Sequence, residues 1–89
     1  MGQLWRGDEE IRLRPKTWDL LCLLVTNPGR LLSKDEIIDA VWGGAAVSDN
    51  MPGISVAELR RALQDDTRRP RFIETVHRRG FRFIAAIDR

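Results

Sequence analysis

The chain has 89 residues, 43% of them hydrophobic and 31% charged, as expected for one small globular domain with a modest core. Its longest apolar run, Leu20 to Val25, is too short to span a membrane, and no secretory signal is recognisable at the start. Residues 1–59 carry six Lys/Arg against nine Asp/Glu, a net charge of −3, whereas residues 60–89 carry nine Arg against four Asp/Glu, a net charge of +5. A basic C-terminal end is typical of a nucleic-acid-binding surface, although a solvated basic surface would give the same counts.

The first 14 residues predict a small β-hairpin. Two apolar stretches, Leu4-Trp5 and residues 11–13, flank a polar turn at residues 7–10. Ile11 and Leu13 alternate with arginines, which is the period of a half-buried strand.

A first helix is predicted from Pro15, because proline suits the first turn of a helix. Asn27-Pro28-Gly29 stops it. We expect Cys22 to be a buried core thiol in a reducing compartment rather than a reactive thiol. This expectation follows from the apolar residues that recur at helical spacing, which are Trp18, Leu21, Cys22 and Val25.

A short extended link, Leu31-Leu32, leads into a second helix. Ser33 and Glu36 have the spacing of a capping box, in which the Ser33 hydroxyl accepts from the Glu36 amide while the Glu36 carboxylate reaches back to Ser33. This helix continues through Trp42 and ends at Gly43-Gly44. Residues 45–48 form a loop, and a third helix runs from about Met51 to Gln64.

Residues 72–84 predict two short strands joined by a turn whose tip carries His77, Arg78 and Arg79. A basic hairpin that follows a helix suits the gripping of a phosphate backbone, and it indicates a winged helix-turn-helix. The expected fold class is therefore α+β. We expect a single domain over residues 1–89, with short N-terminal antiparallel strands (1–14), a three-helix core (15–64) and a C-terminal β-hairpin wing (71–87).

The third helix has a buried stripe and an opposite face that is free for a ligand. At about 100° per residue, the residues Pro52, Val56, Leu59 and Leu63 fall together on the buried side. The free face carries Asn50, Ile54, Ala57, Glu58 and Arg61, with Gly53 and Arg60 beside it.

Each polar or apolar side chain of the free face has two interpretations. Ile54 is either an isolated surface isoleucine or a contact for a thymine methyl group, and Asn50 either pairs with adenine or caps the helix. Arg60 and Arg61 suit phosphate contacts, because the N-terminal residues of such a helix reach the bases. Glu58 either reads a cytosine amino group or pairs with Arg61, and we favour the ion pair.

The chain resembles the OmpR/PhoB-type winged helix-turn-helix DNA-binding domain of bacterial transcription regulators. The matching motifs are Leu13-Arg-Pro-Lys-Thr-Trp-Asp-Leu-Leu21, Asn27-Pro-Gly-Arg-Leu-Leu-Ser33, Ala40-Val-Trp42, Val47-Ser-Asp-Asn50, Leu59-Arg-Arg-Ala-Leu63, Phe72-Ile-Glu-Thr-Val76 and Gly80-Phe-Arg-Phe83. They occur in order along nearly the whole chain, with Gly80-Phe81 where the family usually has Gly-Tyr.

The resemblance implies sequence-specific binding of double-stranded DNA for transcriptional regulation in the cytoplasm. The helix at 51–64 would enter the major groove, and the tip at 77–80 would reach an adjacent minor groove. The loop 43–49 corresponds to a segment that contacts RNA polymerase in some members, and most members bind direct repeats as two copies. The positions where DNA-backbone contacts are usual are Ser33, Lys34, Trp42, Arg60 and Thr75. Ser33 also caps a helix, and for Trp42 we rank a core-filling role first.

The chain departs from the family pattern in two places. It has room for about two strands before Pro15, where the family usually has four, so we expect a domain excised from a longer regulator. Met51-Pro52-Gly53 stands where the recognition helix begins, and proline followed by glycine predicts a helix that starts late or frays. If groove reading is lost, the alternative function is a winged-helix protein-interaction module with weak or non-specific DNA binding.

An enzyme is not indicated. One histidine and one cysteine, 55 residues apart, make no zinc site unaided, and no nucleophile–base pair or phosphate-binding glycine loop is recognisable. We therefore expect no metal and no cofactor. His77 is either a proton-dependent phosphate contact or an ordinary exposed turn histidine, and we favour the second.

Overall fold

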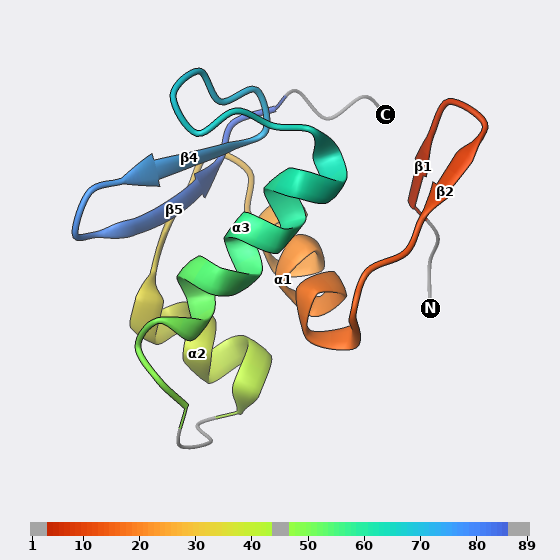
Figure 1. Cartoon of the computed structure of the whole chain (residues 1–89). Helices are drawn as coiled ribbons and strands as arrows, with labels where there is room; N and C mark the ends of the chain where they lie inside the picture. The colour runs from red at the N-terminus through yellow and green to blue at the C-terminus, as the bar shows by residue number, and fades with distance from the viewer. Residues whose placement is uncertain (1–3, 44–46, 86–89) are drawn as a thin grey trace.

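The computed structural model of the chain describes residues 4–43 and 47–85 (Figure 1). The elements, in order, are β1 (Leu4–Arg6), β2 (Glu9–Ile11), α1 (Pro15–Val25), β3 (Leu31–Ser33), α2 (Lys34–Trp42), α3 (Met51–Leu63), β4 (Ile73–Val76) and β5 (Gly80–Phe83). The α+β class, with three helices between an N-terminal and a C-terminal hairpin, is confirmed. Within the described ranges, no helix has the length and apolar character needed to cross a membrane.

The N-terminal hairpin pairs β1 with β2 in antiparallel register, from Leu4 opposite Ile11 to Arg6 opposite Glu9. Its two-residue turn places Gly7 at a φ of +62°, which suits a glycine at the first central position of a hairpin turn. Figure 1 shows this hairpin beside the helices rather than within the other sheet. Leu13 lies after β2, not in the strand as expected, and both Leu4 and Leu13 pack against the core.

The prediction for α1 is confirmed in part, because Leu21 is buried and Trp18 and Val25 pack, partly buried, against the core. The buried residues of this helix are Thr17, Leu20, Leu21 and Leu24, while Cys22 is exposed, so the prediction of a buried thiol is wrong. At about 100° per residue, Cys22 lies about 150° from the centre of the buried stripe. The predicted and observed stripes share Leu21, and the packing of the other elements buries Leu20 and Leu24 rather than Cys22.

The second sheet has the strand order β3-β5-β4, and both of its pairings are antiparallel. Leu31-Leu32, predicted as an extended link, is part of strand β3 and pairs with Arg82 and Phe81 of β5. The sheet and helices enclose one core, whose buried hydrophobic members are Leu20, Leu21, Leu24, Leu32, Ile37, Val41, Val56, Leu59, Ile73, Phe81 and Phe83.

Gly80 joins the three strands of this sheet. It stands opposite Ser33 of β3 and opposite Val76 of β4, with a φ of +151°. A Cβ atom at this position would lie 1.9 Å from the carbonyl oxygen of Leu32. The close approach of β3 to β5 therefore requires glycine here.

The predicted capping box at the start of α2 is confirmed. The Glu36 amide donates to Ser33 Oγ at 3.0 Å, and the Ser33 amide donates to Glu36 Oε1 at 3.2 Å. That hydrogen bond from the Ser33 backbone lowers the pKa of Glu36 against the desolvation of its carboxylate, and the charge of Arg30 also lowers it. Gly43 ends the helix in the left-handed conformation, with a φ of +62°.

The chain leaves α3 through a Schellman turn that leads to the wing. The amide of Gln64 donates to the Arg61 carbonyl and that of Asp65 to the Arg60 carbonyl, with Gln64 at a φ of +56°. The Asp65 carboxylate then accepts from the backbone amides of residues 71–73. Burial acts to raise the pKa of Asp65, but these hydrogen bonds outweigh it and the pKa falls below its ordinary value.

Candidate nucleic-acid interface

Helix α3 begins at Met51, so the prediction of a late start is wrong. Pro52 lies in the first turn, where its missing amide costs no helical hydrogen bond, and the Ile54 amide donates to the Asn50 carbonyl at 3.0 Å. The side chain of Pro52 is fully buried, which anchors this turn in the core. Fraying of residues 52–55 stays a prediction, and strong amide protection there would contradict it.

The N-terminal half of α3 presents a small and largely apolar surface. Ile54 is 56% exposed and Ala57 is also exposed. At Gly53, an added Cβ would meet no atom of the described residues within 4 Å, so neither packing nor backbone strain requires glycine there. The Asn50 side chain makes no capping hydrogen bond to the described residues, which leaves it available to a ligand.

Glu58 does not pair with Arg61 as predicted. Its carboxylate accepts a hydrogen bond of 2.9 Å from the buried hydroxyl of Thr17, and its other oxygen lies 3.8 Å from Arg14 Nε. A buried hydroxyl needs a partner, and this need outweighs the few tenths of a kcal/mol, about 0.2–0.5, of an exposed pair on one helix. Glu58 is therefore directed toward α1, whereas Arg61 is exposed.

Arg60 is buried, which contradicts its assignment to the free edge of the helix. Only 8% of the residue is exposed, and Nη2 donates to the Ile73 carbonyl at 2.8 Å and to Thr75 Oγ1 at 2.6 Å. Burial lowers the pKa of Arg60, while the charge of Asp65 acts to raise it. An arginine side chain stays protonated in proteins, so a positive charge is held between α3 and β4.

The predicted wing tip is confirmed as an exposed turn. His77, Arg78 and Arg79 are all exposed, and the Arg79 amide donates to the Val76 carbonyl at 2.9 Å. Arg78 has a φ of +64°, a conformation usually taken by glycine or asparagine at this place in a type II turn. The turn therefore holds an arginine at some conformational cost.

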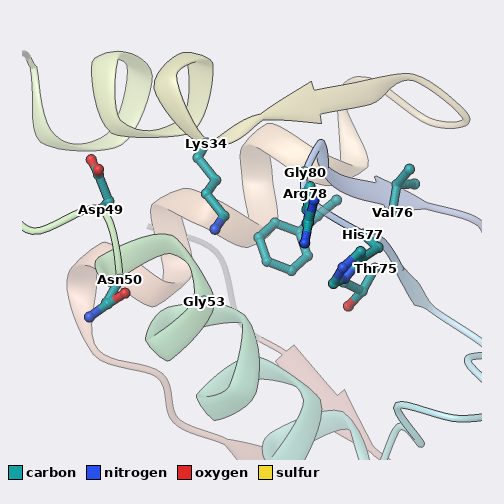
Figure 2. Close-up of a pocket in the computed structure, with 10 residues that line it drawn as sticks. Lys34, Asp49, Asn50, Gly53, Thr75, Val76, His77, Arg78 and Gly80 are labelled. Carbon is teal, nitrogen blue, oxygen red and sulfur yellow. The ribbon is translucent and has the colours of Figure 1, made fainter.

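The wing and the first turns of α2 and α3 surround one shallow hollow of about 280 Å³ (Figure 2). Lys34, the first residue of α2, extends into the space between α3 and the wing, and Arg78 and His77 lie across from it. The hollow brings together most of the predicted site residues that are not on the outer face of α3, although Asp49 adds one negative charge. Its lining residues are Lys34, Asp49, Asn50, Gly53, Thr75, Val76, His77, Arg78, Gly80 and Phe81.

A neighbouring hollow of about 300 Å³ is lined by Ser33, Lys34, Arg78 and Arg79 and also by the carboxylates of Asp35 and Asp49. The cationic groups therefore continue along this surface, with two acidic groups among them. Cationic donors beside a helix N-terminus suit an anion such as a phosphate group. No group of three or more His, Cys, Asp or Glu able to hold a metal ion occurs among residues 4–43 and 47–85.

On the other side of α3, Trp42 is half-buried and packs against the core, in agreement with the structural role ranked first. Together with Ile54 it borders a hollow of about 340 Å³ that also includes Arg14 and Lys16. Sequence reasoning missed these two residues at the start of α1. Lys16 Nζ donates to the Val41 carbonyl at 3.0 Å, a contact that no local pattern predicts.

Comparisons with known proteins agree with this arrangement. The family model described as "Transcriptional regulatory protein, C terminal" matches residues 8–83. The chain is 34% identical to the transcriptional activator CadC of Escherichia coli over 88 residues, which are 98% of this chain and 17% of CadC. It is 36% identical to the KDP operon transcriptional regulatory protein KdpE of E. coli over 80 residues, which are 89% of this chain and 36% of KdpE. The chain thus spans well under half of these relatives.

Solved structures show the same fold. The DNA-binding domain of E. coli CadC superposes with a TM-score of 0.83 at 34% identity, covering 94% of this chain and 79% of that one. The Klebsiella pneumoniae RstA DNA-binding domain, in complex with the RstA box, has a TM-score of 0.82 at 26% identity and covers 92% and 82%. From the family match over residues 8–83, the winged helix and these neighbours, we conclude that the chain belongs to the OmpR/PhoB-type family of transcriptional-regulator DNA-binding domains.

Proposed function

We propose that this domain binds double-stranded DNA in a sequence-specific manner and thereby regulates transcription. In this proposal, α3 enters the major groove, and the wing tip contacts the backbone and an adjacent minor groove. The observation that carries the proposal is the single surface on which the first turn of α3, Lys34 and the tip residues Arg78 and His77 meet. No catalytic step and no cofactor belong to the proposal.

Base reading would depend on very few side chains. Glu58 contacts α1 and Arg60 contacts the wing, so the exposed surface near the start of α3 consists mainly of Asn50, Ile54 and Ala57, with the half-buried Gly53 between them. An exposed isoleucine suits contact with a thymine methyl group, and an asparagine amide suits the N6 and N7 edge of adenine. The expected half-site is therefore rich in A·T pairs.

The basic groups around the two hollows would bind the phosphate backbone of the DNA. Arg78, Arg79 and Lys34 are exposed cations that can neutralise phosphates, and Arg61 extends this set on α3. Ser33 borders one of the hollows and Thr75 the other, so their hydroxyls can reach the same backbone. Affinity should therefore fall steeply with salt concentration. Replacing Arg78 or Arg79 with alanine should reduce the slope of log K against log[salt] by about one per lost contact.

The decisive experiment is a selection of binding sites from random duplex DNA. An enriched motif would support specific recognition, and two copies of it in the same orientation would support binding of direct repeats by two domains. Ile54 is then tested by replacing single thymines of the motif with deoxyuridine, which lacks the methyl group. The substitution should weaken wild-type binding by about 1 kcal/mol at one position and have no effect on Ile54→Ala. Ile84→Ala, which alters another exposed isoleucine after β5, is the control.

A protein-interaction module is the second candidate, favoured by the scarcity of hydrogen-bonding side chains on the free face of α3. A folded domain that enriches no motif and binds all duplexes equally would support it. Contact with RNA polymerase through loop 43–49 also stays a prediction, and residues 44–46 of that loop lie outside the described residues. We place the domain in the bacterial cytoplasm, where its proposed ligand is found.

A further inference from the structure

The structure points to a role for Arg60 that differs from a direct phosphate contact. Its guanidinium connects α3 to β4 through two hydrogen bonds from Nη2, one to the Ile73 carbonyl and one to Thr75 Oγ1. Thr75 itself is exposed and borders the hollow that faces Lys34 and Arg78 (Figure 2). Thr75 thus contacts a buried cation through its hydroxyl and also lines the basic hollow.

The chemistry of the hydroxyl determines the direction of its hydrogen. A threonine hydroxyl has one hydrogen and two lone pairs, and a guanidinium can donate but never accept. The short contact of 2.6 Å therefore uses a lone pair of Thr75, and the hydrogen of the hydroxyl is left for another acceptor. No described residue accepts that hydrogen, and because Thr75 is exposed the hydrogen is free for solvent or for an anion in the adjacent hollow.

Fold stability alone explains Arg60 poorly. Burying a cation costs free energy, and a well-packed apolar side chain often serves as well or better at such a place. Arg60 Nε is also buried with no partner among the described residues, which adds to the cost. An apolar side chain would supply neither the hydrogen bond to the Ile73 carbonyl nor the hydrogen bond that orients the Thr75 hydroxyl, and of these two groups Thr75 borders the basic hollow.

We propose that Arg60 is a positioning residue that turns the Thr75 hydroxyl into a hydrogen-bond donor for a DNA phosphate, while the guanidinium itself does not touch the phosphate. The inference rests on the proposed DNA binding but not on sequence specificity. A phosphate contact is independent of sequence, so a short duplex of random sequence is a sufficient probe.

The first test compares substitutions at Thr75. Thr75→Val keeps the shape but removes the hydroxyl, and it should weaken binding of the random duplex by about threefold to tenfold. Thr75→Ser retains the hydroxyl and should bind within about twofold of the wild type. Thr67→Val, the same change at an exposed threonine in the segment between α3 and β4, should bind like the wild type.

The salt dependence separates this role from a displaced wing. Loss of a neutral hydroxyl should leave the slope of log K against log[salt] unchanged in Thr75→Val. A wing that had moved would lose its Arg78 and Arg79 contacts and would lower the slope by about one for each. An unchanged slope together with weaker binding supports the inference, and a lowered slope contradicts it.

A double-mutant cycle tests Arg60 directly, measured at a temperature where all four proteins are folded. Arg60→Lys keeps the charge but loses the geometry of the guanidinium, so it should weaken binding when residue 75 is threonine and have little further effect in Thr75→Val. An equal loss in both backgrounds would show that Arg60 acts on DNA by itself. If Arg60→Lys does not fold, the comparison of Thr75→Val with Thr75→Ser still decides, because equal affinities would refute the role of the hydroxyl.

The proposed function and this inference fail in different ways. A wild-type chain that binds no duplex at all would refute both. A wild-type chain that binds the random duplex, and whose affinity is unaffected by Thr75→Val, would refute the inference alone.

Discussion

Replacing Gly80 with alanine tests whether the contact between β3 and β5 sets the stability of the domain. The added Cβ would lie 1.9 Å from the Leu32 carbonyl oxygen, 2.8 Å from the Leu32 carbonyl carbon and 3.0 Å from Ser33 Cα. All three are backbone atoms, so no side-chain rotation relieves the contact. Ordinary contact begins at 3.4 Å, and β3 would have to retreat by about 1.5 Å, which breaks the hydrogen bonds of that ladder.

The expected loss of stability follows from two contributions. A positive φ of 151° is unfavourable for alanine by about 1–3 kcal/mol. About two lost ladder hydrogen bonds at about 1 kcal/mol each add about 2 kcal/mol. The total of about 3–5 kcal/mol is large compared with the unfolding free energy of an ordinary domain, which is about 5–15 kcal/mol. At about 4–8 °C for each kcal/mol, the melting temperature should fall by at least about 12 °C.

Two other glycines provide matched controls for the same Gly→Ala change in thermal unfolding followed by circular dichroism. Gly43 has a φ of +62° but open space around its missing Cβ, so it isolates backbone strain of about 1–2 kcal/mol. Gly53 lies within α3 with neither strain nor contact, and alanine there should stabilise by about 0.5–1 kcal/mol.

The expected order of melting temperatures is therefore Gly53→Ala above wild type, Gly43→Ala below it, and Gly80→Ala far below both. A loss at Gly80 no larger than the loss at Gly43 would refute the reasoning. It would mean that β3 and β5 can move apart enough to admit the Cβ atom while they keep their hydrogen bonds.

Three further predictions concern the turns around the wing. Asp65→Asn should lower the melting temperature most at neutral pH, because the pKa of Asp65 is lower in the folded than in the unfolded chain. The ionised carboxylate therefore stabilises the fold above its unfolded pKa of about 3.9, and this stabilisation is lost as the pH falls through the folded pKa. The melting temperatures of the variant and the wild type should converge below pH ~4. A constant difference at all pH values would contradict this. Arg78→Gly should change unfolding free energy by between zero and about +1 kcal/mol while reducing the salt slope of DNA binding by about one, and an unchanged slope would remove Arg78 from the interface. Gln64→Gly should stabilise by about 0.5–1 kcal/mol because the left-handed position of the Schellman turn favours glycine, whereas Ala62→Gly, within the helix, should destabilise by about 1 kcal/mol.

Features determined by near neighbours in the sequence could be predicted from it. The capping box of Ser33 and Glu36 needs only four consecutive residues, and both of its hydrogen bonds are formed. The start of α1 at Pro15 and the exposed tip of the wing at Arg78 and Arg79 depend equally on local chemistry. These predictions hold because no distant element competes for the groups involved.

Features determined by distant partners could not be predicted. Glu58 accepts from Thr17, 41 residues away, and Arg60 donates to Thr75, 15 residues away. Helical spacing places both residues correctly around α3, but it does not say which element packs beside each face. Cys22 shows the same limit, because the other elements of the core choose between overlapping apolar stripes.

The junction of β3 and α2 has a mechanical consequence. Ser33 is at once the last residue of β3, the cap of α2 and the partner of Gly80 in β5, so no linker residue separates strand from helix. The hydrogen bond from Arg60 to the Ile73 carbonyl connects the other wing strand, β4, to α3. These connections hold the wing, α2 and α3 at fixed distances from one another. A duplex whose groove spacing does not match these distances must bend or twist to bind. The free energy of that deformation depends on the DNA sequence, even at base pairs that no side chain contacts.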